Sequence, residues 1–176
     1  MTEYYRAKLQ DGNEYSDWIS DKLRQANPSI IIGMYASKKY QIEKGESFSG
    51  IEIKNDRRLA GDDDGRPTHN LYFEVAEKSC KERTNYVDSG IYRSDNCWLY
   101  LTGNYEEAFL FSTKQLIWLY ENKKYHDLYG VETKKTDTSM GFIIPRDKVL
   151  NSIYLLQHWV FDEEKIKLHH PKQNAL

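Results

Sequence analysis

Two short segments of the sequence alternate charged with apolar residues, "GIEIKND" at residues 50–56 and "LYFEVAEKS" at residues 71–79. Each pattern predicts a β-strand with one buried face, because successive side chains of a strand point to opposite faces. The polar face of the first strand carries Glu52, Lys54 and Asp56, and that of the second carries Glu74 and Lys78. Carboxylates and a lysine on rigid strands are suited to binding a divalent metal ion and a phosphate group.

An antiparallel hairpin of these two strands would place Glu52 beside Glu74 and Lys54 beside Tyr72, with Lys78 on the same face. Like charges opposite each other on a sheet cost up to about 1 kcal/mol, so we expect a cation between the glutamates. Mg²⁺ or Mn²⁺ prefers carboxylate oxygens, and a lysine can stabilise charge on a phosphate or orient the attacking water. The pattern therefore favours metal-assisted hydrolysis of phosphodiester bonds. The candidate catalytic residues are Glu52, Glu74, Lys54 and Lys78.

Other interpretations of the charged residues stay open. The strand residues also fit a solvated face, on which Lys/Glu pairs across strands are each worth less than about 1 kcal/mol. On the predicted first helix, an acidic stripe either faces solvent or supplements the strand carboxylates; its members are Glu14, Asp17 and Asp21. We take Glu14 as a third metal-ligand candidate beside the two strand glutamates.

Periodicity and turn signals predict the elements that must position these residues. Helical spacing of apolar residues predicts helices over residues 13–25, 112–124 and 146–161. The second of these helices begins with an S-x-x-Q capping box of Ser112 and Gln115. Strands are predicted over residues 29–37, 50–56, 71–79 and 140–145, with two more within 89–112. Polar segments at 57–70 and 126–139 are predicted loops. This order indicates an α/β or α+β fold with local antiparallel pairing.

The length and the cysteine content of the chain limit how many domains and disulfides it can form. Its 176 residues fit one domain, which we expect over residues 1–168, followed by a flexible tail at 169–176. The two cysteines, Cys80 and Cys97, are too few for a disulfide scaffold and lack the spacing of a zinc knuckle. We therefore predict no role for either thiol.

Charge and hydropathy exclude some classes of partner. Charged residues make up 30% of the chain, and no apolar run approaches the roughly 18 residues that span a bilayer, so we expect no membrane partner. The N-terminal segment lacks the pattern of a secretory signal, which predicts a cytoplasmic protein. Because the net charge is −2, any contact with nucleic acid must come from local basic patches.

With these residues in this order of elements, the sequence resembles the restriction-endonuclease-like superfamily of nucleases, whose loose signature is PD-(D/E)xK. The resemblance implies a core of a helix, three strands, a helix and a further strand, here residues 13–124. It also implies a metal-dependent endonuclease that acts on DNA. The segments "GIEIKND", "NLYFEVAEKS" and "NYVDSGIYR" further resemble small uncharacterised proteins of phages and bacteria that fall in the same superfamily.

Two mappings of this signature are open. In the first, Glu52 takes the place of the family aspartate and Glu74 that of the E in E-x-K, while Ala76 stands where the lysine belongs. In the second, "EIK" at residues 52–54 is the E-x-K and Glu46 is the upstream acid, similar to the "GVELK" strand of mismatch-repair nicking endonucleases. Because the chain has no proline–aspartate pair, the alternative function is a catalytically inactive module that binds DNA or protein.

DNA is the partner that this resemblance implies, and basic residues near the predicted loops could contact its phosphates. The candidates are Lys38, Lys39, Arg57, Arg58 and Arg93. Each one alone is more simply explained as a solvated surface residue, but as a group they would bind DNA in a strongly salt-dependent way. Double-strand cleavage needs two active sites, so a homodimer is an alternative to a monomer.

Overall fold

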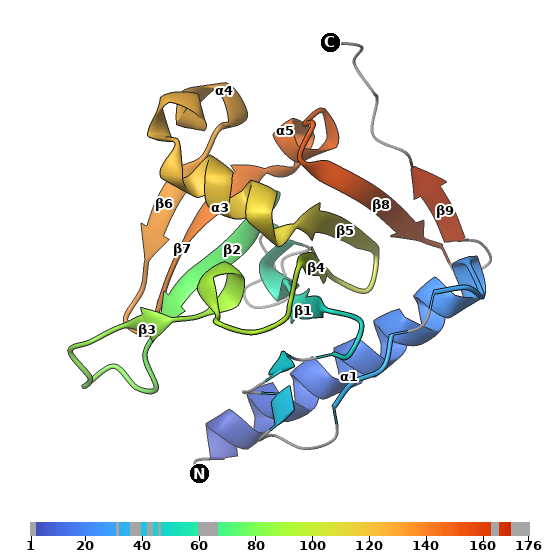
Figure 1. The fold of residues 1–176 in the computed structure, drawn as a ribbon, viewed down its shortest axis with the longest axis horizontal. Coiled ribbons are helices and arrows are strands. Elements are labelled where there is room, and N and C mark those ends of the chain that lie inside the picture. Colours follow the sequence, from blue (N-terminus) through green and yellow to red (C-terminus); the bar gives the residue numbers. More distant parts are fainter. Residues whose placement is uncertain are drawn as a thin grey trace.

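The computed structural model of the protein describes residues 3–30, 32–35, 40–41, 44–45, 47–59, 67–162 and 166–169, with side chains from residue 10 onward. These residues form a mixed α+β fold in which two β-sheets are flanked by helices (Figure 1). This confirms the predicted α/β or α+β class, whereas the restriction-endonuclease-like core stays a prediction. None of the described helices combines the length and apolar character that a bilayer-crossing helix needs.

The elements are named here in chain order. The helices are α1 (Glu3–Ala26), α3 (Thr113–Glu121), α4 (His126–Tyr129) and α5 (Arg146–Leu150), with 3₁₀ helices η1 (Arg57–Leu59), η2 (Gly90–Tyr92) and η3 (Lys123–Tyr125). The strands are β1 (Ile51–Asn55), β2 (Asn70–Glu77), β3 (Val87–Asp88), β4 (Leu99–Gly103), β5 (Glu107–Ser112), β6 (Glu132–Lys135), β7 (Ser139–Pro145), β8 (Leu155–Phe161) and β9 (Ile166–His169).

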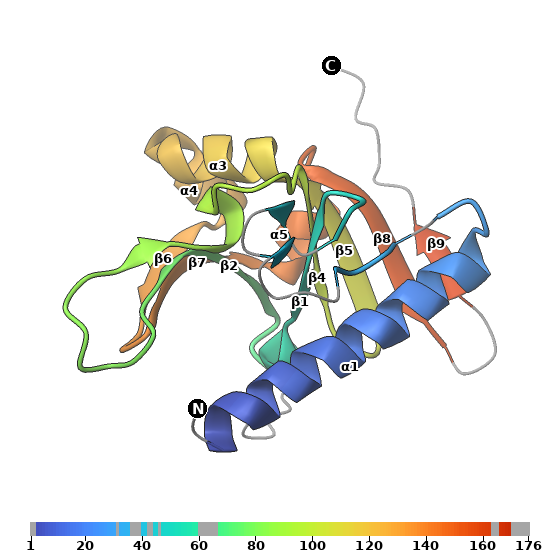
Figure 2. The same ribbon diagram turned by 60° about the horizontal axis from the view of Figure 1, so that its bottom comes forward.

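The first sheet has the strand order β1-β4-β5-β8-β9, and β1 runs parallel to β4 while the other neighbours are antiparallel. The carbonyl of Gly50 accepts the backbone N–H of Leu99 and so fixes the start of β1 beside β4. Alternation along β1 buries Ile51 and Ile53 against α1, which packs there through Ile19 and its neighbours. Helix α1 crosses this face from β1 towards β9 (Figures 1 and 2). The opposite face of β1 is turned towards the second sheet.

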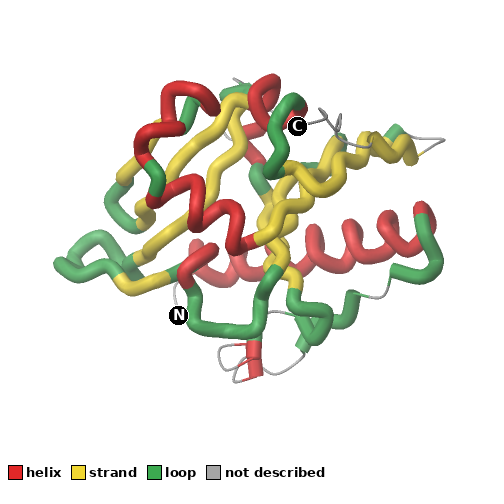
Figure 3. The backbone as a smooth tube through the Cα atoms, turned by 45° about the horizontal axis from the view of Figure 1, so that its top comes forward, coloured by secondary structure: helices red, strands yellow, loops and turns green. Residues whose placement is uncertain are grey.

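The second sheet has the order β3-β2-β7-β6 and is antiparallel throughout. It lies beside the first sheet and is curved like an arch, with a concave inner side (Figure 2). Its apolar face meets the first sheet in an aromatic core, where the ring of Phe73 lies 5.1 Å from both Phe111 and Phe142. Helix α3 completes this core with Leu116 and Leu119. In Figure 3 the helix lies across the strands of the second sheet. The polar face of β2 is left to line the inside of the arch.

The predicted hairpin of the two charged strands is wrong. β1 pairs with β4, whereas β2 pairs with β3 and β7, so Glu52 and Glu74 are not cross-strand neighbours. The reason is that their apolar faces belong to different cores: Ile51 and Ile53 pack against α1, and Phe73 packs against α3. The three-stranded antiparallel meander that we expected to begin with these two strands is therefore not formed by β1 and β2.

Several other predicted elements are confirmed with changed bounds. Strands β2, β4, β5 and β7 lie where the sequence patterns and turn signals placed them, and α1 begins at Glu3 rather than near residue 13. Helix α3 follows Ser112 as predicted, although the Ser112 side chain makes no capping hydrogen bond. The pattern of apolar residues thus accounts for the position of α3, whereas the predicted capping hydrogen bond of Ser112 is not formed.

The helix predicted over residues 146–161 is wrong beyond its first turn. α5 ends early and strand β8 follows, which buries Leu155 and Trp159. A continuing helix would have buried Ile153 and Leu156 instead, but these side chains are 60% and 38% exposed. The apolar run fits both periods over this short stretch, and the sheet edge offered by β5 selects the strand.

Three remaining predicted segments differ or lie partly outside the description. The loop predicted over residues 126–139 contains α4 and β6. In the segment predicted as a strand over 29–37, the described residues form only an isolated bridge from Met34 to Ser47. Residues 60–66 of the predicted hairpin loop and residues 170–176 of the predicted tail lie outside the described residues.

Candidate functional site

A small cleft of about 130 Å³ lies between β1 and β4 of the first sheet and β2 of the second. Its lining residues are Lys54, Asn55, Asp56, Tyr72, Glu74, Tyr100 and Thr102. The parallel register sets Glu52 beside Tyr100 and Lys54 beside Thr102, because neighbouring residues of paired strands share a face. The cleft thus brings Lys54 and Glu74 together from separate sheets.

Glu52 does not line the cleft itself but contacts Lys54, which does, and it is only 1% exposed. The Lys54 ammonium is 2.7 Å from Glu52 Oε1, and Arg93 Nη1 is 3.4 Å from Oε2. A buried carboxylate is tolerated only when it is paired, because removing the charge from water costs several kcal/mol. Glu52 therefore fixes the position of Lys54 at the wall of the cleft.

Glu74 is held by hydroxyl groups on the inside of the arch. Ser89 Oγ donates to Glu74 Oε1 at 2.6 Å, and Ser139 Oγ donates to Oε2 at 2.9 Å. The Tyr72 hydroxyl lies 2.6 Å from Ser139 Oγ and extends the network along the sheet. Since an ionised carboxylate accepts at about four lone-pair sites, two hydroxyl bonds leave Glu74 with capacity for a further ligand.

The charges of Glu52, Lys54 and Glu74 meet at the hydroxyl of Tyr100. Burial raises the pKa of this hydroxyl well above its ordinary range; the Lys54 charge lowers the pKa, and the charges of Glu52 and Glu74 raise it. Lys54 and Glu74 line the same cleft through contact between the two sheets rather than through a hairpin, and Glu52 approaches them through its ion pair with Lys54.

Asp56 follows β1 and ties the two sheets together at the mouth of the cleft. Its Oδ2 accepts the backbone N–H of Tyr72 at 3.0 Å, and its own N–H donates to the Gly103 carbonyl. Burial raises the pKa of the Asp56 carboxyl to about 6, against the lowering effect of the backbone N–H groups of Tyr72, Arg58 and Leu59. A carboxyl that titrates near neutral pH inside a cleft has the properties of a general base.

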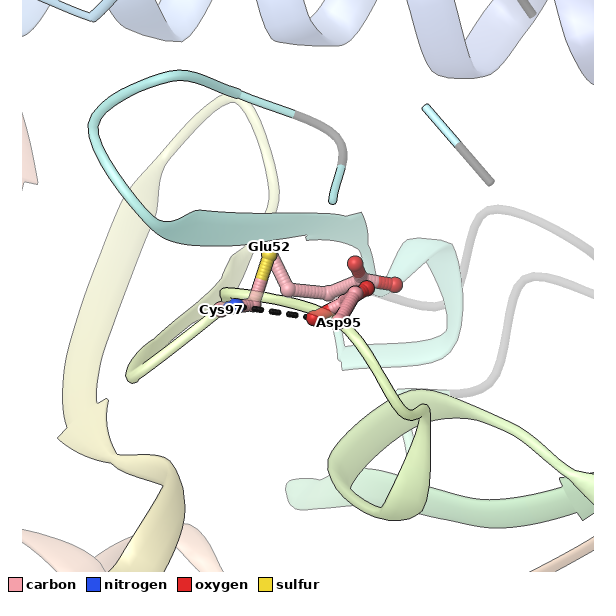
Figure 4. A group of neighbouring side chains, drawn as sticks. All are labelled: Glu52, Asp95 and Cys97. Atoms are coloured by element: carbon pink, nitrogen blue, oxygen red, sulfur yellow. Dashed lines mark hydrogen bonds between the residues drawn. The ribbon is translucent and has the colours of Figure 1, made fainter. Parts of the chain in front are cut away.

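A second group of side chains meets Glu52 from its other side, as Figure 4 shows. One ligand atom each of Glu52, Asp95 and Cys97 lies within 4.8 Å of the other two. Asp95 Oδ1 accepts the backbone N–H of Cys97 at 2.8 Å, and Arg93 Nε is 3.9 Å from Asp95 Oδ2. Arg93 therefore stands between two carboxylates whose side chains are each 2% exposed.

The structure separates Lys78 and Glu14 from the cleft. The Lys78 ammonium donates to the Lys81 carbonyl and lies 4.9 Å from the centre of the Tyr86 ring, at the far end of β2. Glu14 accepts a hydrogen bond from Gln10 on an exposed face of α1. The helix residue that approaches the cleft is Asp11, whose Oδ2 is 3.4 Å from the side-chain nitrogen of Asn55.

The predicted phosphate-contacting residues are also distributed unevenly. Arg57 and Arg58 are exposed on η1, directly after the Asp56 corner, and Arg57 lies 4.0 Å from Asp11. Arg93 instead faces inward to its carboxylate partners. Lys38, Lys39 and Glu46 lie outside the described residues.

Sequence reasoning placed Asp56 on the polar face of the first charged strand without giving it a role, and it missed Asp95 and Tyr100 as members of the site. A role for Asp56 had a signal, because this residue ends a charged strand directly before two arginines. Asp95 also had a signal, since an aspartate in a polar turn segment often accepts the backbone N–H of the residue two positions later. Tyr100 had no signal, because its role depends on the parallel pairing of β1 with β4.

Comparison with known proteins leaves the family of this chain undetermined: protein-family models, curated proteins and solved structures contain no match to it. The resemblance to PD-(D/E)xK nucleases therefore remains a prediction based on the residues alone.

Proposed function

We propose that the protein is a divalent-metal-dependent endonuclease that hydrolyses phosphodiester bonds of DNA in the cleft between the two sheets. The observation that carries the proposal is the position of Lys54, whose ammonium is 2.7 Å from buried Glu52 and lines the same cleft as Glu74. This is the residue combination that hydrolysis at phosphorus requires: oxygen ligands for a hard cation and a fixed positive charge for the phosphate.

Glu74 and Glu52 would hold Mg²⁺ or Mn²⁺. Both carboxylates act on the hydroxyl of Tyr100, and Glu74 retains lone pairs beyond its two serine donors. Hard divalent ions need only one or two carboxylates when waters and a phosphate supply the other ligands. When bound, such an ion would neutralise charge on the phosphate and lower the pKa of a coordinated water.

Lys54 is the residue that would contact the scissile phosphate. Its side chain is 32% exposed, so it is anchored by Glu52 at one side and accessible from the cleft at the other. A positioned ammonium stabilises negative charge that develops on phosphate oxygens. Asp56, with a pKa of about 6, would be mostly ionised at neutral pH and able to accept a proton from water.

The DNA backbone would approach past the exposed residues Arg57 and Arg58, which directly follow Asp56 of the cleft in the sequence. Contacts of this type position the duplex without reading its sequence, and their strength falls steeply with salt. The proposal therefore includes binding that weakens as salt is added.

Nicking of supercoiled plasmid in the presence of MgCl₂ or MnCl₂ tests this proposal. We expect activity that EDTA abolishes, and a loss of at least about 100-fold in Lys54→Ala and in Glu74→Gln, because each removes a group that contacts the phosphate or the ion. The matched controls are Lys114→Ala and Glu132→Gln, which change exposed residues of α3 and β6 and should retain wild-type rates. Thermal denaturation of every variant verifies folding. Wild-type rates in folded Lys54→Ala and Glu74→Gln would reject the site.

A second candidate function is a DNA-binding module without catalysis. One observation favours it: the two buried carboxylates, Glu52 and Asp95, are already balanced by two cations, Lys54 and Arg93. A site that needs no metal for charge balance need not bind one. In this case DNA binding would fall with salt but would be unaffected by EDTA and by Glu74→Gln, and no nicking would occur.

A further inference from the structure

We propose that Glu52, Asp95 and Cys97 form a binding site for a thiophilic divalent cation, with Zn²⁺ as the preferred ion. The three side chains come from β1 and from the segment between η2 and β4, and their ligand atoms all lie within 4.8 Å of one another (Figure 4). A site with three protein ligands and one position left for water is a common arrangement for zinc.

The donor set selects the type of ion. Carboxylate oxygens alone favour Mg²⁺ or Ca²⁺, whereas a thiolate favours softer ions such as Zn²⁺. Zinc–oxygen distances of about 2.0–2.2 Å and a zinc–sulfur distance of about 2.3 Å let one ion reach three ligand atoms that lie within 4.8 Å of one another.

The carboxylate of Asp95 supplies an independent indication of a ligand. Its side chain is 2% exposed, yet among the described residues its Oδ2 accepts no hydrogen bond and has only a long ion pair with Arg93 Nε, at 3.9 Å. A buried carboxylate oxygen without a hydrogen bond costs about 1–3 kcal/mol or more. Figure 4 shows that this carboxylate points towards that of Glu52. A metal ion at this point would satisfy it.

The backbone around the thiol leaves room for this arrangement. Gly45 has a φ of +95°, and a Cβ at this position would lie 2.7 Å from Cys97 Sγ and 3.4 Å from Asp95 Cγ. Glycine both permits the left-handed conformation and keeps a side chain out of the space beside the thiol. Gly45 therefore lies beside the thiol without filling the site.

The positive charges of Lys54 and Arg93 oppose the binding of a cation, so removing one of them should raise the affinity for Zn²⁺. Both side chains pair with Glu52, so a dication must displace or tolerate their charges. Lys54 is partly exposed and can turn to solvent. Replacing it by alanine removes a repulsive charge and should strengthen Zn²⁺ binding, whereas the same change should abolish DNA cleavage.

Metal titration of the full chain with ZnCl₂ tests the site without any measurement of nuclease activity. We expect Cys97→Ser and Asp95→Asn to weaken Zn²⁺ binding at least tenfold and Lys54→Ala to strengthen it. Cys80→Ser is the matched control, because Cys80 is the exposed second thiol, and it should bind as wild type does. Equal Zn²⁺ affinity in folded Cys97→Ser and in wild type would overturn the proposal.

A spectroscopic readout needs no change at the site itself. In Cys80→Ser protein, the only thiol is Cys97. Addition of Co²⁺ should therefore produce a sulfur-to-cobalt charge-transfer band in the near ultraviolet, and excess Zn²⁺ should remove it. A cobalt complex without this band would show that the thiol is not a ligand, whatever the outcome of the nuclease assay.

Discussion

Asp56 shows how a single residue can serve both the fold and the chemistry of the cleft. It accepts the Tyr72 N–H from the other sheet, and burial raises its pKa to about 6 from an ordinary value of 3.8. A raised carboxyl pKa means that the folded state binds the proton more tightly than the unfolded state. The associated stability is present in full below about pH 3.8 and is lost as the pH rises through about 6.

Asp56→Asn removes this titration and should change the slope of stability against pH. Between pH 4 and 7 we expect the variant to gain stability relative to the wild type by up to about 3 kcal/mol, since one pKa unit corresponds to about 1.4 kcal/mol. Urea denaturation at a series of pH values measures the difference. The control is Asp127→Asn on exposed α4. Parallel curves for wild type and Asp56→Asn would mean that the pKa is not raised.

At the scale of elements, the alternation of β2 and β7 builds the Glu74 network, and its geometry depends on Gly141. A Cβ at position 141 would lie 2.3 Å from the Phe73 carbonyl oxygen and 2.6 Å from Tyr72 Cζ. The backbone oxygen cannot move away without breaking the sheet. Position 141 is thus limited to glycine by close approach of a neighbouring strand.

Gly141→Ala should therefore destabilise the protein by about 1–3 kcal/mol through overpacking. Gly12→Ala offers the opposite case, because nothing lies within 4 Å of a Cβ at that position in the interior of α1. Alanine there should stabilise the helix by up to about 1 kcal/mol. Thermal denaturation of the two variants compares identical chemical changes. A neutral Gly141→Ala would contradict the packing of Tyr72 against this strand.

Alternation was sufficient to predict β2, which buries one apolar face. Apolar segments bounded by turn signals predicted β4, β5 and β7, although β4 is buried on both faces. Alternation also placed Glu52 and Lys54 on one face of β1. The sequence could not reveal the partner of β1, since an alternating strand fits either a hairpin with β2 or a parallel edge beside β4. The choice depends on long-range packing of Ile53 against α1, and local pattern contains no information on that contact.

At the scale of the whole molecule, a buried ionic network joins the two sheets. Arg146 begins α5 directly after β7 and donates two hydrogen bonds to Glu107 of β5, at 2.5 and 2.7 Å. His158 Nε2 of β8 lies 2.8 Å from Glu107 Oε2. Burial raises the pKa of Glu107, but the hydrogen bonds from His158 and Arg146 outweigh it, and the pKa is lowered overall.

Arg146→Met should cost about 3 kcal/mol at neutral pH, because it leaves Glu107 buried without its bidentate partner. A lowered carboxyl pKa gives stability that is present above the ordinary value of 4.5 and is lost as the pH falls below it. The difference between variant and wild type should therefore shrink in acid. Lys134→Met, which breaks an exposed pair with Glu132, should cost less than about 1 kcal/mol. Equal costs for the two variants in urea denaturation would contradict the network.

The most direct test of the proposed active site is anomalous diffraction from crystals of the wild-type protein soaked in MnCl₂. We expect a manganese peak in the cleft between the sheets, near the Tyr100 hydroxyl and within coordination distance of the Glu74 and Glu52 carboxylates. Manganese bound only at other carboxylates, with no peak in the cleft, would contradict metal-dependent catalysis at this site.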